Sequence, residues 1–567
     1  MKIIAMTKSF YTVINKLILT FFLLFVLIKT EVYSQISSKE ISISVSDFGA
    51  IPDDSINDRS AINKALIHCK ENNMANLFFP PGKYILEHPD AVALMNDVMN
   101  LKMGENPAKT IFKPYYKYIK GLDISGHQNL RLTGYGVELI CKGWMEPISI
   151  ENSGNITVKG FTIDYHRQPH SEGKVIQITD EYFDVKFTEE YPVKSNMVMP
   201  RIMFFDVKKD RLESEPVYFP EKNKLISPQT LRIWAKIPGS YLKDYALINH
   251  SFHFRPAVLI HESKDVNVID VTIHSQPGMG IVGHRSHNIL MSGLRVVPRP
   301  GRRQSTNTDA THFTSCTGYI HFRNCMFEGQ GDDATNVHNY YYTITGMSKN
   351  KYITKILNPS EGTHAMVLDY PDVGDTLELV NKSTLKPVKE VIVADVDTFP
   401  DKWETHIGLN EELPADLDPY FLINISRLPR LHIEGCTILS HLARGILIKT
   451  RNVLIENNTI METTGTGIQI GAEGYWHEGP GSENVVIRNN RIIRCGLGDG
   501  TQKETSGIVV SVGSPDPAKY GVHKNLIFEN NIIEGENARY GIYVTGSDDV
   551  KIRYNQISGC EIPVYVE

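Results

Sequence analysis

Two short stretches of the chain carry carboxylates in the same setting. Asp309 lies in "NTDATH" (307–312), and Asp332 and Asp333 lie in "GQGDDATN" (329–336), so that Asp309 and Asp333 are 24 residues apart and each is followed by Ala-Thr. Carboxylates that meet in one site cannot all ionise cheaply, so the pKa of at least one of them rises. A protonated and an ionised carboxyl group together can act as acid and base on a glycosidic bond. The two stretches therefore predict a catalytic site, provided that the fold brings them together.

A recurring pattern predicts such a fold. Segments such as "ITVKGFTI" (156–163) and "VVIRNNRI" (485–492) alternate apolar residues and then bend at Gly or Asn. The third residue of each segment, here called its anchor, is Leu132, Val158, Val268, Met291, Phe322, Ile433, Ile455, Ile487, Phe528 or Ile552. Most anchors are 22–32 residues apart, which is typical of one coil of a parallel β-helix. We interpret the recurring Asn457, Asn458, Asn489, Asn490, Asn530, Asn531 and Asn555 as structural residues that bend the chain and hydrogen-bond between coils.

Two anchor intervals near 110 residues predict inserted domains. Each leaves roughly 85 residues beyond one coil, a size suited to a small domain, and alternating stretches such as "KEVIVADV" predict antiparallel strands within them. The predicted fold class is all-β: a right-handed parallel β-helix with an N-terminal capping helix and two inserted small antiparallel, barrel-like β domains. The predicted parts are 1–34 (signal peptide), 35–165 (cap and N-terminal coils), 166–250 (first insert), 251–340 (catalytic coils), 341–428 (second insert) and 429–567 (C-terminal coils).

The capping helix is expected where Ala61, Ile62, Ala65, Leu66 and Cys69 share one face, which is the spacing of an amphipathic helix. Asn57 or Asp58 is its expected N-cap.

Stacking the coils places the polar candidates in columns. Alignment on Gly280-Ile281 and Gly445-Ile446 gives one column of Met279, Asp309, Asp333, Arg444 and Thr466. Three residues further on stand Val282, His312, Asn336, Leu447 and Gln469, and five further on stand His284, Thr314, His338 and Lys449. Coils stack about 4.8 Å apart, so Asp309, Asp332 and Asp333 are expected to face one cleft. We predict that Asp332 is the acid and that Asp309 and Asp333 hold the attacking water; the predicted substrate-binding residues are His284, His312, Asn336, His338, Arg444 and Lys449.

The structural alternative is that the three Asp are turn residues or bind calcium, that the His are solvated, and that Arg444 and Lys449 only balance the Asp charges. The repetition of Asp-Ala-Thr beside polar columns favours the catalytic interpretation. No CxxC or Cys/His cluster has the spacing of a zinc site, and we expect no metal and no other cofactor.

The bulk composition restricts the partners and the compartment. A formal net charge of −6 gives no reason to expect nucleic acid or an anionic membrane as partner. Lysines at 2, 8 and 16, an apolar core (17–28) and "VYS" (32–34) are typical of a cleaved secretory signal; the alternative is an uncleaved anchor. We expect an exported protein, periplasmic or secreted, without a membrane partner after cleavage.

Seven scattered Cys predict buried thiols, among them Cys325, Cys436 and Cys560, rather than a disulfide scaffold. The last segment, "CEIPVYVE", has no obvious cap. Open β-helix ends need protection, so contact with another copy, in a homo-oligomer, is a hypothesis.

The motifs carry a family resemblance. "DFGAIPDDSINDRSAINKALI" and "FFPPGKY" resemble the N-terminal cap of the pectin-lyase-like β-helix superfamily, and "NTDATH" with "GQGDDATN" resembles motifs of the polygalacturonases, glycoside hydrolase family 28. The Gly-His-Gly motif of that family is missing, and "LIKT" (447–450) matches its Arg-Ile-Lys only in part. The closer resemblance, through "TDATHFTSC", "CMFEGQGDDATNVH" and the two inserts, is to glycoside hydrolase family 110, the exported bacterial α-1,3-galactosidases.

This resemblance covers nearly the whole mature chain. It implies metal-independent, inverting removal of terminal α-1,3-linked galactose from an oligosaccharide or glycoconjugate, as in blood group B and linear Galα1-3Gal glycans. It also implies that Asp332 is the general acid and that Asp309 and Asp333 are the water-activating pair, in agreement with the column argument.

Two rival functions remain. A polygalacturonase-like hydrolase would need cations for uronate carboxylates, and Arg444, Lys449 and the loop residues Arg299, Arg302 and Arg303 could supply them. A non-catalytic β-helical glycan-binding protein is the rival of another class. The sequence does not decide between fucosylated, branched acceptors and linear ones.

Overall fold

The computed structural model describes residues 42–567 except 114–115, 214, 237–243 and 357–367. The predicted signal peptide (1–34) lies outside the described residues. Within the described ranges, no helix combines the length and the apolar character that a membrane span needs.

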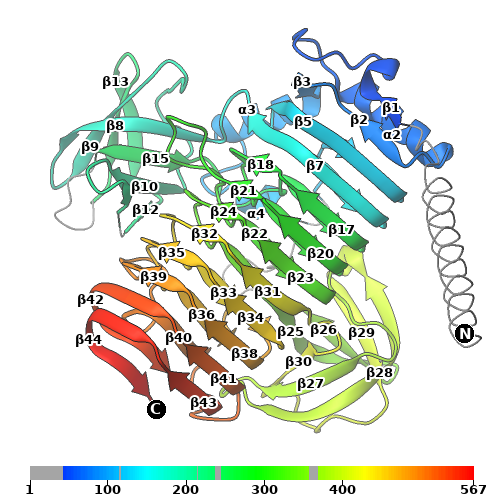
Figure 1. Ribbon diagram of the computed structural model, residues 1–567, viewed down its shortest axis with the longest axis vertical. Coiled ribbons are helices and arrows are strands. Elements are labelled where there is room, and N and C mark those ends of the chain that lie inside the picture. Colours follow the sequence, from blue (N-terminus) through cyan, green and yellow to red (C-terminus); the bar gives the residue numbers. More distant parts are fainter. Residues whose placement is uncertain (1–41, 114–115, 214, 237–243, 357–367) are drawn as a thin grey trace, which may run out of the picture.

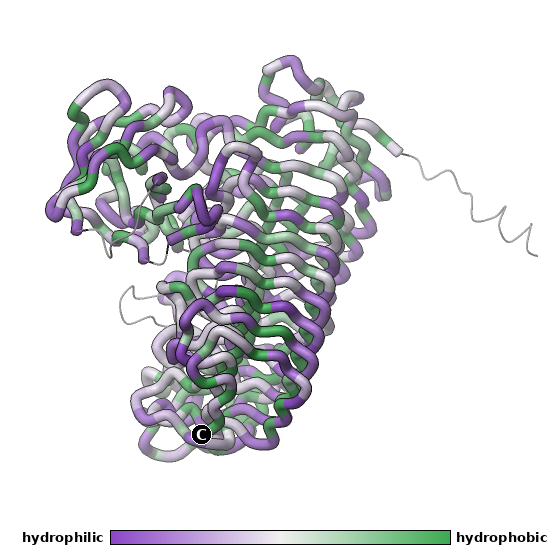
Figure 2. The backbone as a smooth tube through the Cα atoms, turned by 60° about the vertical axis from the view of Figure 1, so that its left-hand side comes forward, coloured by the Kyte–Doolittle hydropathy of each residue, from purple (hydrophilic) through white to green (hydrophobic). Residues whose placement is uncertain are grey.

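Parallel strands stack into three sheets around one apolar core (Figure 1), and Figure 2 shows the coils as successive turns of one long column. The first sheet contains β1 (Ser42–Ser44), β2 (Asn76–Phe78), the starts of β5 (Gln128–Lys142) and β7 (Gly154–Tyr165), β17 (Lys264–Ile269), β20 (His287–Ser292), β23 (Thr317–Arg323), β31 (Arg430–Glu434), β34 (Val453–Glu456), β38 (Glu483–Arg488), β41 (His523–Glu529) and β43 (Ser547–Arg553). The second contains β3 (Gly82–Glu87), the ends of β5 and β7, β18 (Thr272–Ile273), β21 (Arg295–Val296), β24 (Met326–Phe327), β32 (Thr437–Ile438), β35 (Thr459–Met461), β39 (Arg491–Ile493) and the starts of β42 (Ile532–Val544) and β44 (Gln556–Val566).

The third sheet carries the residues of interest. It contains β4 (Lys120–Asp123), β6 (Glu146–Glu151), β16 (Val258–His261), β19 (Ile281–His284), β22 (Thr311–Thr314), the start of β25 (Thr335–Ser348), β33 (Ile446–Ile448), β36 (Ile468–Glu473), β40 (Thr505–Gly513) and the ends of β42 and β44. The short β37 (Glu478–Gly479) lies antiparallel against β25.

The anchors predicted from the sequence lie in one register. Each pairs with the next, from Leu132 with Val158 through to Phe528 with Ile552, across both long intervals. All are buried except Ile552, which lies in the last described coil and is half-buried. The predicted repeat is therefore confirmed coil by coil.

The recurring asparagines bend the coils and link them, as expected. Asn458 donates to Asn490 (3.0 Å), Asn490 to Asn531 (3.0 Å) and Asn531 to Asn555 (2.9 Å), always from Nδ2 to Oδ1. The residue before each of the first three, Asn457, Asn489 and Asn530, has a left-handed backbone with φ of 56–58°, which Asn tolerates better than most residues.

The two inserts differ in form. The first consists of β8 (His170–Ile178), β9 (Tyr182–Phe187), β10 (Arg201–Asp206), β11 (Arg211–Leu212), β12 (Val217–Tyr218), β13 (Lys222–Ser227), β14 (Thr230–Trp234) and β15 (Tyr245–Asn249). Its described strands form an open antiparallel sheet, β11-β10-β15-β8-β9-β14-β13. The second consists of the end of β25 with β26 (Lys351–Lys355), β27 (Thr376–Asn381), β28 (Pro387–Phe399), η2 (Pro400–Lys402), β29 (Glu404–Leu409) and β30 (Tyr420–Asn424), and its strands close on themselves in the order β25-β26-β29-β28-β27-β30. Only the second insert is thus a barrel.

The first strands are capped by α2 (Arg59–Glu71), which contacts β2, β3, β4 and η1 (Val45–Phe48); α3 (Pro89–Met99) and α4 (Ala108–Ile111) follow between β3 and β4 in the chain. In α2, Ile62, Ala65, Leu66 and Cys69 are buried as predicted. Asp58 is the N-cap residue, as predicted, but its side chain makes no capping hydrogen bond: the carboxylate accepts from the backbone of Ile51 and Ile85 and links the start of the helix to β3. The cysteines are free, and Cys560 is only half-buried because it lies in the last coil.

Candidate active site

Ladder hydrogen bonds confirm the predicted column of carboxylates. The amide of Gly280 donates to the carbonyl of Asp309 (2.9 Å), that of Ala310 to Asp333 (3.0 Å) and that of Ala334 to Arg444 (3.1 Å). The next two columns also follow the prediction, because His312 pairs with Asn336 and Thr314 with His338. Asp309 and Asp333 therefore occupy equivalent places on neighbouring coils, where the chain bends into β22 and β25.

The glycine of "GQGDD" is required by a close approach. A Cβ at Gly331 would clash with the carbonyl oxygen of Asn307 and with the guanidinium of Arg201. The same guanidinium donates to that carbonyl and, through Nε, to Asn249 Oδ1 (2.9 Å). The first insert is thus fastened to the turn that carries Asp309, and Gly331 packs closely against both partners of this hydrogen bond.

One oxygen from each of Asp309, Asp332 and Asp333, the aspartate cluster, lies within 4.8 Å of the others. The cluster lines a cavity of about 340 Å³, within the size range of small-ligand sites. The rest of the wall comes from several parts of the chain: Phe112, Arg201, Tyr218, Phe252, His253, Leu259, Met279, Val282, His284, His312, Thr314, Asn336, Tyr340, Leu442, Ala443, Arg444, Trp476, Glu478, Asp499 and Gly500.

Burial sets the protonation of the aspartate cluster. It raises the pKa of Asp309 well above the ordinary value, and the neighbouring Asp332 raises it further. Burial also raises the pKa of Asp332 and of Asp333, although the Arg444 guanidinium opposes the rise at both. Three carboxylates so close together cannot all be charged, and they titrate as a group.

Asp333 has the strongest charge-assisted hydrogen bonds of the three, although burial and the neighbouring Asp332 and Asp309 raise its pKa well above the ordinary value. Its Oδ2 accepts from the guanidinium of Arg444 (2.8 Å) and its Oδ1 from the Arg444 backbone amide (2.8 Å). Two charge-assisted donors from one residue favour the ionised form. Arg444 therefore lies on the cavity wall, as predicted, but much of its charge is used by Asp333.

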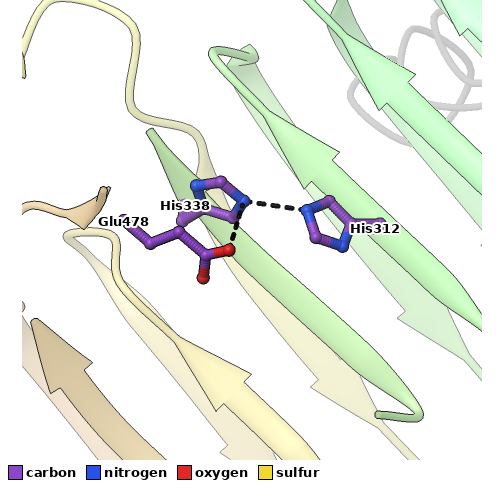
Figure 3. Close-up of side chains that lie close together, drawn as sticks. All are labelled: His312, His338 and Glu478. Carbon is purple, nitrogen blue, oxygen red and sulfur yellow. Dashed lines mark hydrogen bonds and ion pairs between the residues drawn. The ribbon is translucent and has the colours of Figure 1, made fainter. Parts of the chain in front are cut away.

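Histidines extend the site beyond the aspartate cluster, and Figure 3 shows His312 and His338 with Glu478. His312 Nδ1 lies 2.6 Å from Asp309 Oδ2, and its Nε2 lies 2.8 Å from Nε2 of His338. His338 Nε2 lies 3.6 Å from Glu478. Burial lowers the pKa of His312, and it lowers the pKa of His338 to about 3, so the His338 imidazole is neutral near pH 7.

Two predicted substrate-binding residues lie behind the cavity wall. Lys449 is fully buried, with Nζ 2.8 Å from Glu473 and 2.6 Å from Glu478, and it is not a lining residue. His338 is likewise buried and absent from the lining. The physical reason is β37, which pairs with the continuation of β25 and brings Glu478 over both side chains. The prediction of direct sugar contact by His338 and Lys449 is therefore corrected.

The remaining predicted residues line the cavity. Asn336 donates to Glu478 (3.1 Å). His284 contacts Thr314 (2.7 Å) and Asp369 (3.2 Å), and burial lowers its pKa to about 4. A substrate would meet His284 as a residue already oriented by two partners.

Sequence reasoning missed the residues that come from outside the coils. Arg201 and Tyr218 belong to the first insert, and Tyr218 reaches across to Asp499 of a C-terminal coil (2.8 Å). Trp476 and Glu478 lie on the loop between β36 and β38. None of them occupies a repeat position, so no periodicity pointed to them.

Among the described residues, three side-chain groups have the composition of a metal site: the aspartate cluster, His312 with His338 and Glu478, and the half-buried His321, His432 and Glu434. In the first two, a cation is already present, since Arg444 neutralises Asp333 and Lys449 neutralises Glu478. The 2.8 Å between the imidazole nitrogens of His312 and His338 is a hydrogen-bond distance, too short for two ligands of a tetrahedral zinc with bonds of about 2.0 Å.

Two family models match the chain. "Right handed beta helix region" matches residues 419–557, and "Rhamnogalacturonase A/epimerase, pectate lyase-like" matches residues 42–134. Among curated relatives, an alpha-1,3-galactosidase A of Shewanella woodyi is 26% identical, with 93% of this chain and 89% of the relative covered. An alpha-1,3-galactosidase B of Phocaeicola vulgatus is 27% identical, with 80% and 78% covered. These matches confirm the resemblance inferred from the two aspartate motifs.

Similar solved structures are more distant. The A-module of the mannuronan C-5 epimerase AlgE4 of Azotobacter vinelandii is 11% identical, with a TM-score of 0.43 and coverage of 93% and 98%. A family 28 exopolygalacturonase of Yersinia enterocolitica is 12% identical, with a TM-score of 0.39 and coverage of 93% and 78%. The β-helix is established by the strand pairing and the first family model rather than by these structures.

Proposed function

We propose, from its resemblance to glycoside hydrolase family 110 and its right-handed β-helix, that this chain removes terminal α-1,3-linked galactose from glycans such as blood group B antigen and linear Galα1-3Gal. The activity named for the curated relatives supports the substrate class. The observation that carries the catalytic assignment is the convergence of Asp309, Asp332 and Asp333 on one cavity.

Asp332 is assigned as the general acid. Burial raises its pKa, which favours the protonated form that an acid needs, but it also raises the pKa of Asp309 and Asp333, so the assignment depends on the partners of each carboxyl group. Its Oδ1 accepts from the Asp333 amide at 3.2 Å, and no lysine or arginine nitrogen of the described residues forms an ion pair with it. Asp332 is therefore the member of the aspartate cluster best suited to protonate the leaving oxygen.

Asp309 and Asp333 are assigned to the attacking water, because they occupy equivalent positions on neighbouring coils. Arg444 holds both oxygens of Asp333 and His312 faces one oxygen of Asp309, so neither is a free nucleophile for a covalent intermediate. A single displacement by water inverts the anomeric centre. Inverting enzymes usually hold their acid and base roughly 6.5–9.5 Å apart, whereas one oxygen from each Asp lies within 4.8 Å of the others. The anomeric outcome must therefore be measured rather than inferred from the separation.

The polygalacturonase alternative loses most of its expected cations. Arg299 and Arg302 form ion pairs with Asp164 (2.7 and 3.0 Å), Arg303 pairs with Glu172 (3.4 Å), and none of the three lines the cavity. Walls from the first insert and from the C-terminal coils enclose the cavity on two sides. This arrangement favours the end of a neutral glycan over the interior of a uronate chain.

The test is Asp332→Asn, which keeps the size of the side chain but removes the transferable proton. We expect hydrolysis of Galα1-3Gal to fall by about 10²–10⁴, while calorimetry still detects sugar binding. The control is Asp180→Asn, at an exposed turn of the first insert, which should leave the rate unchanged. Full activity of Asp332→Asn would remove Asp332 from the acid role, and binding without any hydrolysis by the unmodified protein would favour the glycan-binding alternative.

We also propose that the protein is exported, to the periplasm or outside the cell. The basic and apolar composition of residues 1–34 supports export. Mass spectrometry of the protein from its host should find a mature chain that begins at Gln35, and an intact leader in the mature protein would contradict cleavage.

Self-association through the last coil is a further part of the proposal. Among the described strands β44 pairs with β42 alone, and its Tyr565 and Val566 are 36% and 54% exposed. Unpaired edges are templates for strand pairing. A monomer in light scattering at high protein concentration would contradict it.

A further inference from the structure

His312 lies between Asp309 and His338 in a short hydrogen-bonded series, and Figure 3 shows its contact with His338. Its Nδ1 faces Asp309 Oδ2 at 2.6 Å and its Nε2 faces His338 Nε2 at 2.8 Å, and the two rings are nearly perpendicular, at 86°. At the far end, His338 Nδ1 lies 3.0 Å from the carbonyl oxygen of Asn339. Each ring nitrogen in the series therefore has a partner at hydrogen-bond distance, and His338 Nε2 also lies 3.6 Å from Glu478.

The contact between His338 Nδ1 and the Asn339 carbonyl determines which ring nitrogens of His338 and His312 carry a hydrogen. A carbonyl oxygen only accepts, so His338 Nδ1 carries a hydrogen and donates it. Since His338 is neutral, its Nε2 is an acceptor, and Nε2 of His312 must be the donor between the two rings. His312 is thus protonated on the side that faces away from Asp309.

Only one proton is then left for the contact between Asp309 and His312. Either Asp309 carries it and donates to a neutral His312, or His312 carries it as an imidazolium and donates to an ionised Asp309. Without any proton, a carboxylate oxygen and a nitrogen lone pair would face each other at 2.6 Å. We propose that Asp309 and His312 share one proton, and that His312 is the positioning residue that takes it when Asp309 serves as the base. This inference rests on the proposed function and extends it.

The charges that surround His312 agree with a shared proton. The carboxylates of the site and of its back wall are those of Asp309, Asp332, Asp333, Asp499, Glu473 and Glu478, and the cations are Arg201, Arg444 and Lys449. These six acids and three cations leave an excess of three negative charges. One proton on Asp332 and one on the Asp309–His312 pair reduce the excess to one, and Asp499 accepts a hydrogen bond from Tyr218 (2.8 Å).

The hydrolytic step then balances. With the shared proton on His312, Asp309 is a carboxylate whose Oδ1 can take one proton from the attacking water. The water oxygen bonds to the anomeric carbon, the bond from that carbon to the glycosidic oxygen breaks, and Asp332 gives its proton to the leaving oxygen. Asp309 and His312 together have gained one proton and Asp332 has lost one, and exchange with solvent restores both after the sugars leave.

The first test reads the tautomers without using activity. The intact protein, labelled with ¹⁵N-histidine, is compared with His312→Asn and His338→Gln to assign the ring signals. We expect a hydrogen on Nε2 of His312 and on Nδ1 of His338. A His312 protonated on Nδ1 alone, with a bare Nε2, would overturn the shared-proton arrangement, whether or not the protein hydrolyses galactosides.

The second test is kinetic. His312→Asn can still donate to Asp309 but cannot take up a proton, so we expect the acid limb of the kcat profile to move to higher pH by more than about one unit. We expect kcat at the optimum to fall about 10–100-fold, within the usual contribution of proton transfer, with a smaller change in KM. The control, His321→Asn, alters a histidine of the outer His321–His432 stack and should shift nothing.

The kinetic outcomes separate the two proposals. An unmoved acid limb in His312→Asn, whatever its kcat, would reduce His312 to a structural role and leave the galactosidase proposal intact. A complete lack of hydrolysis by the unmodified protein would refute the proposed function instead, and the tautomer measurement would still decide the shared proton.

Discussion

Lys449 offers a sharp test of how the site is held in place. Its side chain is fully buried, and Nζ forms ion pairs with Glu473 (2.8 Å) and Glu478 (2.6 Å). Lys449→Met keeps much of the volume but leaves two buried carboxylates without a cation. Removing one partner of a buried ion pair destabilises a protein by about 3–5 kcal/mol.

The loss of free energy can be expressed as a shift in Tm, because the unfolding entropy scales with the number of residues. An unfolding entropy of about 2.1 cal/mol/K per residue, over roughly 530 residues, gives about 1.1 kcal/mol/K if the chain unfolds as one unit. A loss of 3–5 kcal/mol then lowers Tm by about 3–5 °C. Differential scanning calorimetry resolves a shift of that size.

The deficit should depend on pH in a definite direction. Burial lowers the pKa of Lys449, but Glu473 and Glu478 more than offset this, so its pKa lies above the ordinary value. Its contribution to the free energy of unfolding is therefore fully present below about pH 10 and is lost only as pH rises through the folded-state pKa. In the variant, the two unpaired glutamates take up protons as pH falls, so the deficit should be largest near pH 7–8 and should shrink towards about pH 5.

A matched variant separates charge from packing. Lys449→Met combined with Glu473→Gln and Glu478→Gln removes the unpaired charges and should recover most of the lost Tm. A deficit that does not change with pH, or a triple variant as unstable as the single one, would refute the charge argument and indicate lost packing.

Three further predictions follow from other parts of the structure. Asn490→Ala interrupts the asparagine series, leaves Asn458 Nδ2 and Asn531 Oδ1 short of a partner and should cost about 1–3 kcal/mol by chemical denaturation; an unchanged denaturation midpoint would contradict a stabilising role. Gly331→Ala forces the turn away from Asn307 and should lower kcat by at least about tenfold, because small displacements of catalytic groups are costly; wild-type kcat would contradict the close approach. Trp476→Ala, at the cavity wall, should raise KM for Galα1-3Gal by about 5–30-fold through loss of about 1–2 kcal/mol of aromatic contact. The KM for an aryl galactoside should change by a different factor. An equal change in KM for both substrates would place Trp476 outside the acceptor region.

The coils were predictable because their signal repeats. Anchors such as Val158 and Val268 are 110 residues apart in sequence and still pair directly, since the insert between them leaves and rejoins the same coil. The column of Asp309, Asp333 and Arg444 followed from the same alignment. In a β-helix, register is fixed by the stacked apolar residues, so side-chain neighbours on successive coils can be derived from sequence alone.

The alignment of the coils could not show whether a polar side chain lines the cavity or lies behind its wall. His338 and Lys449 occupy outward positions of their strands, and the alternation alone predicted that they line the groove. Glu478 covers them because β37 adds an antiparallel pairing to β25, outside the repeat. Asp369, which orients His284, comes from the second insert for the same reason. Segments outside the repeat therefore determine which polar side chains line the cavity and which lie behind it.

The most direct test of the catalytic account is proton NMR of the reaction with Galα1-3Gal, recorded from the first minutes, with oligogalacturonate in a parallel sample. The account predicts that galactose appears first as the β anomer and that the uronate is untouched. Galactose released first as the α anomer would contradict the water held by Asp309 and Asp333. Cleavage of the uronate alone would contradict the galactosidase assignment itself.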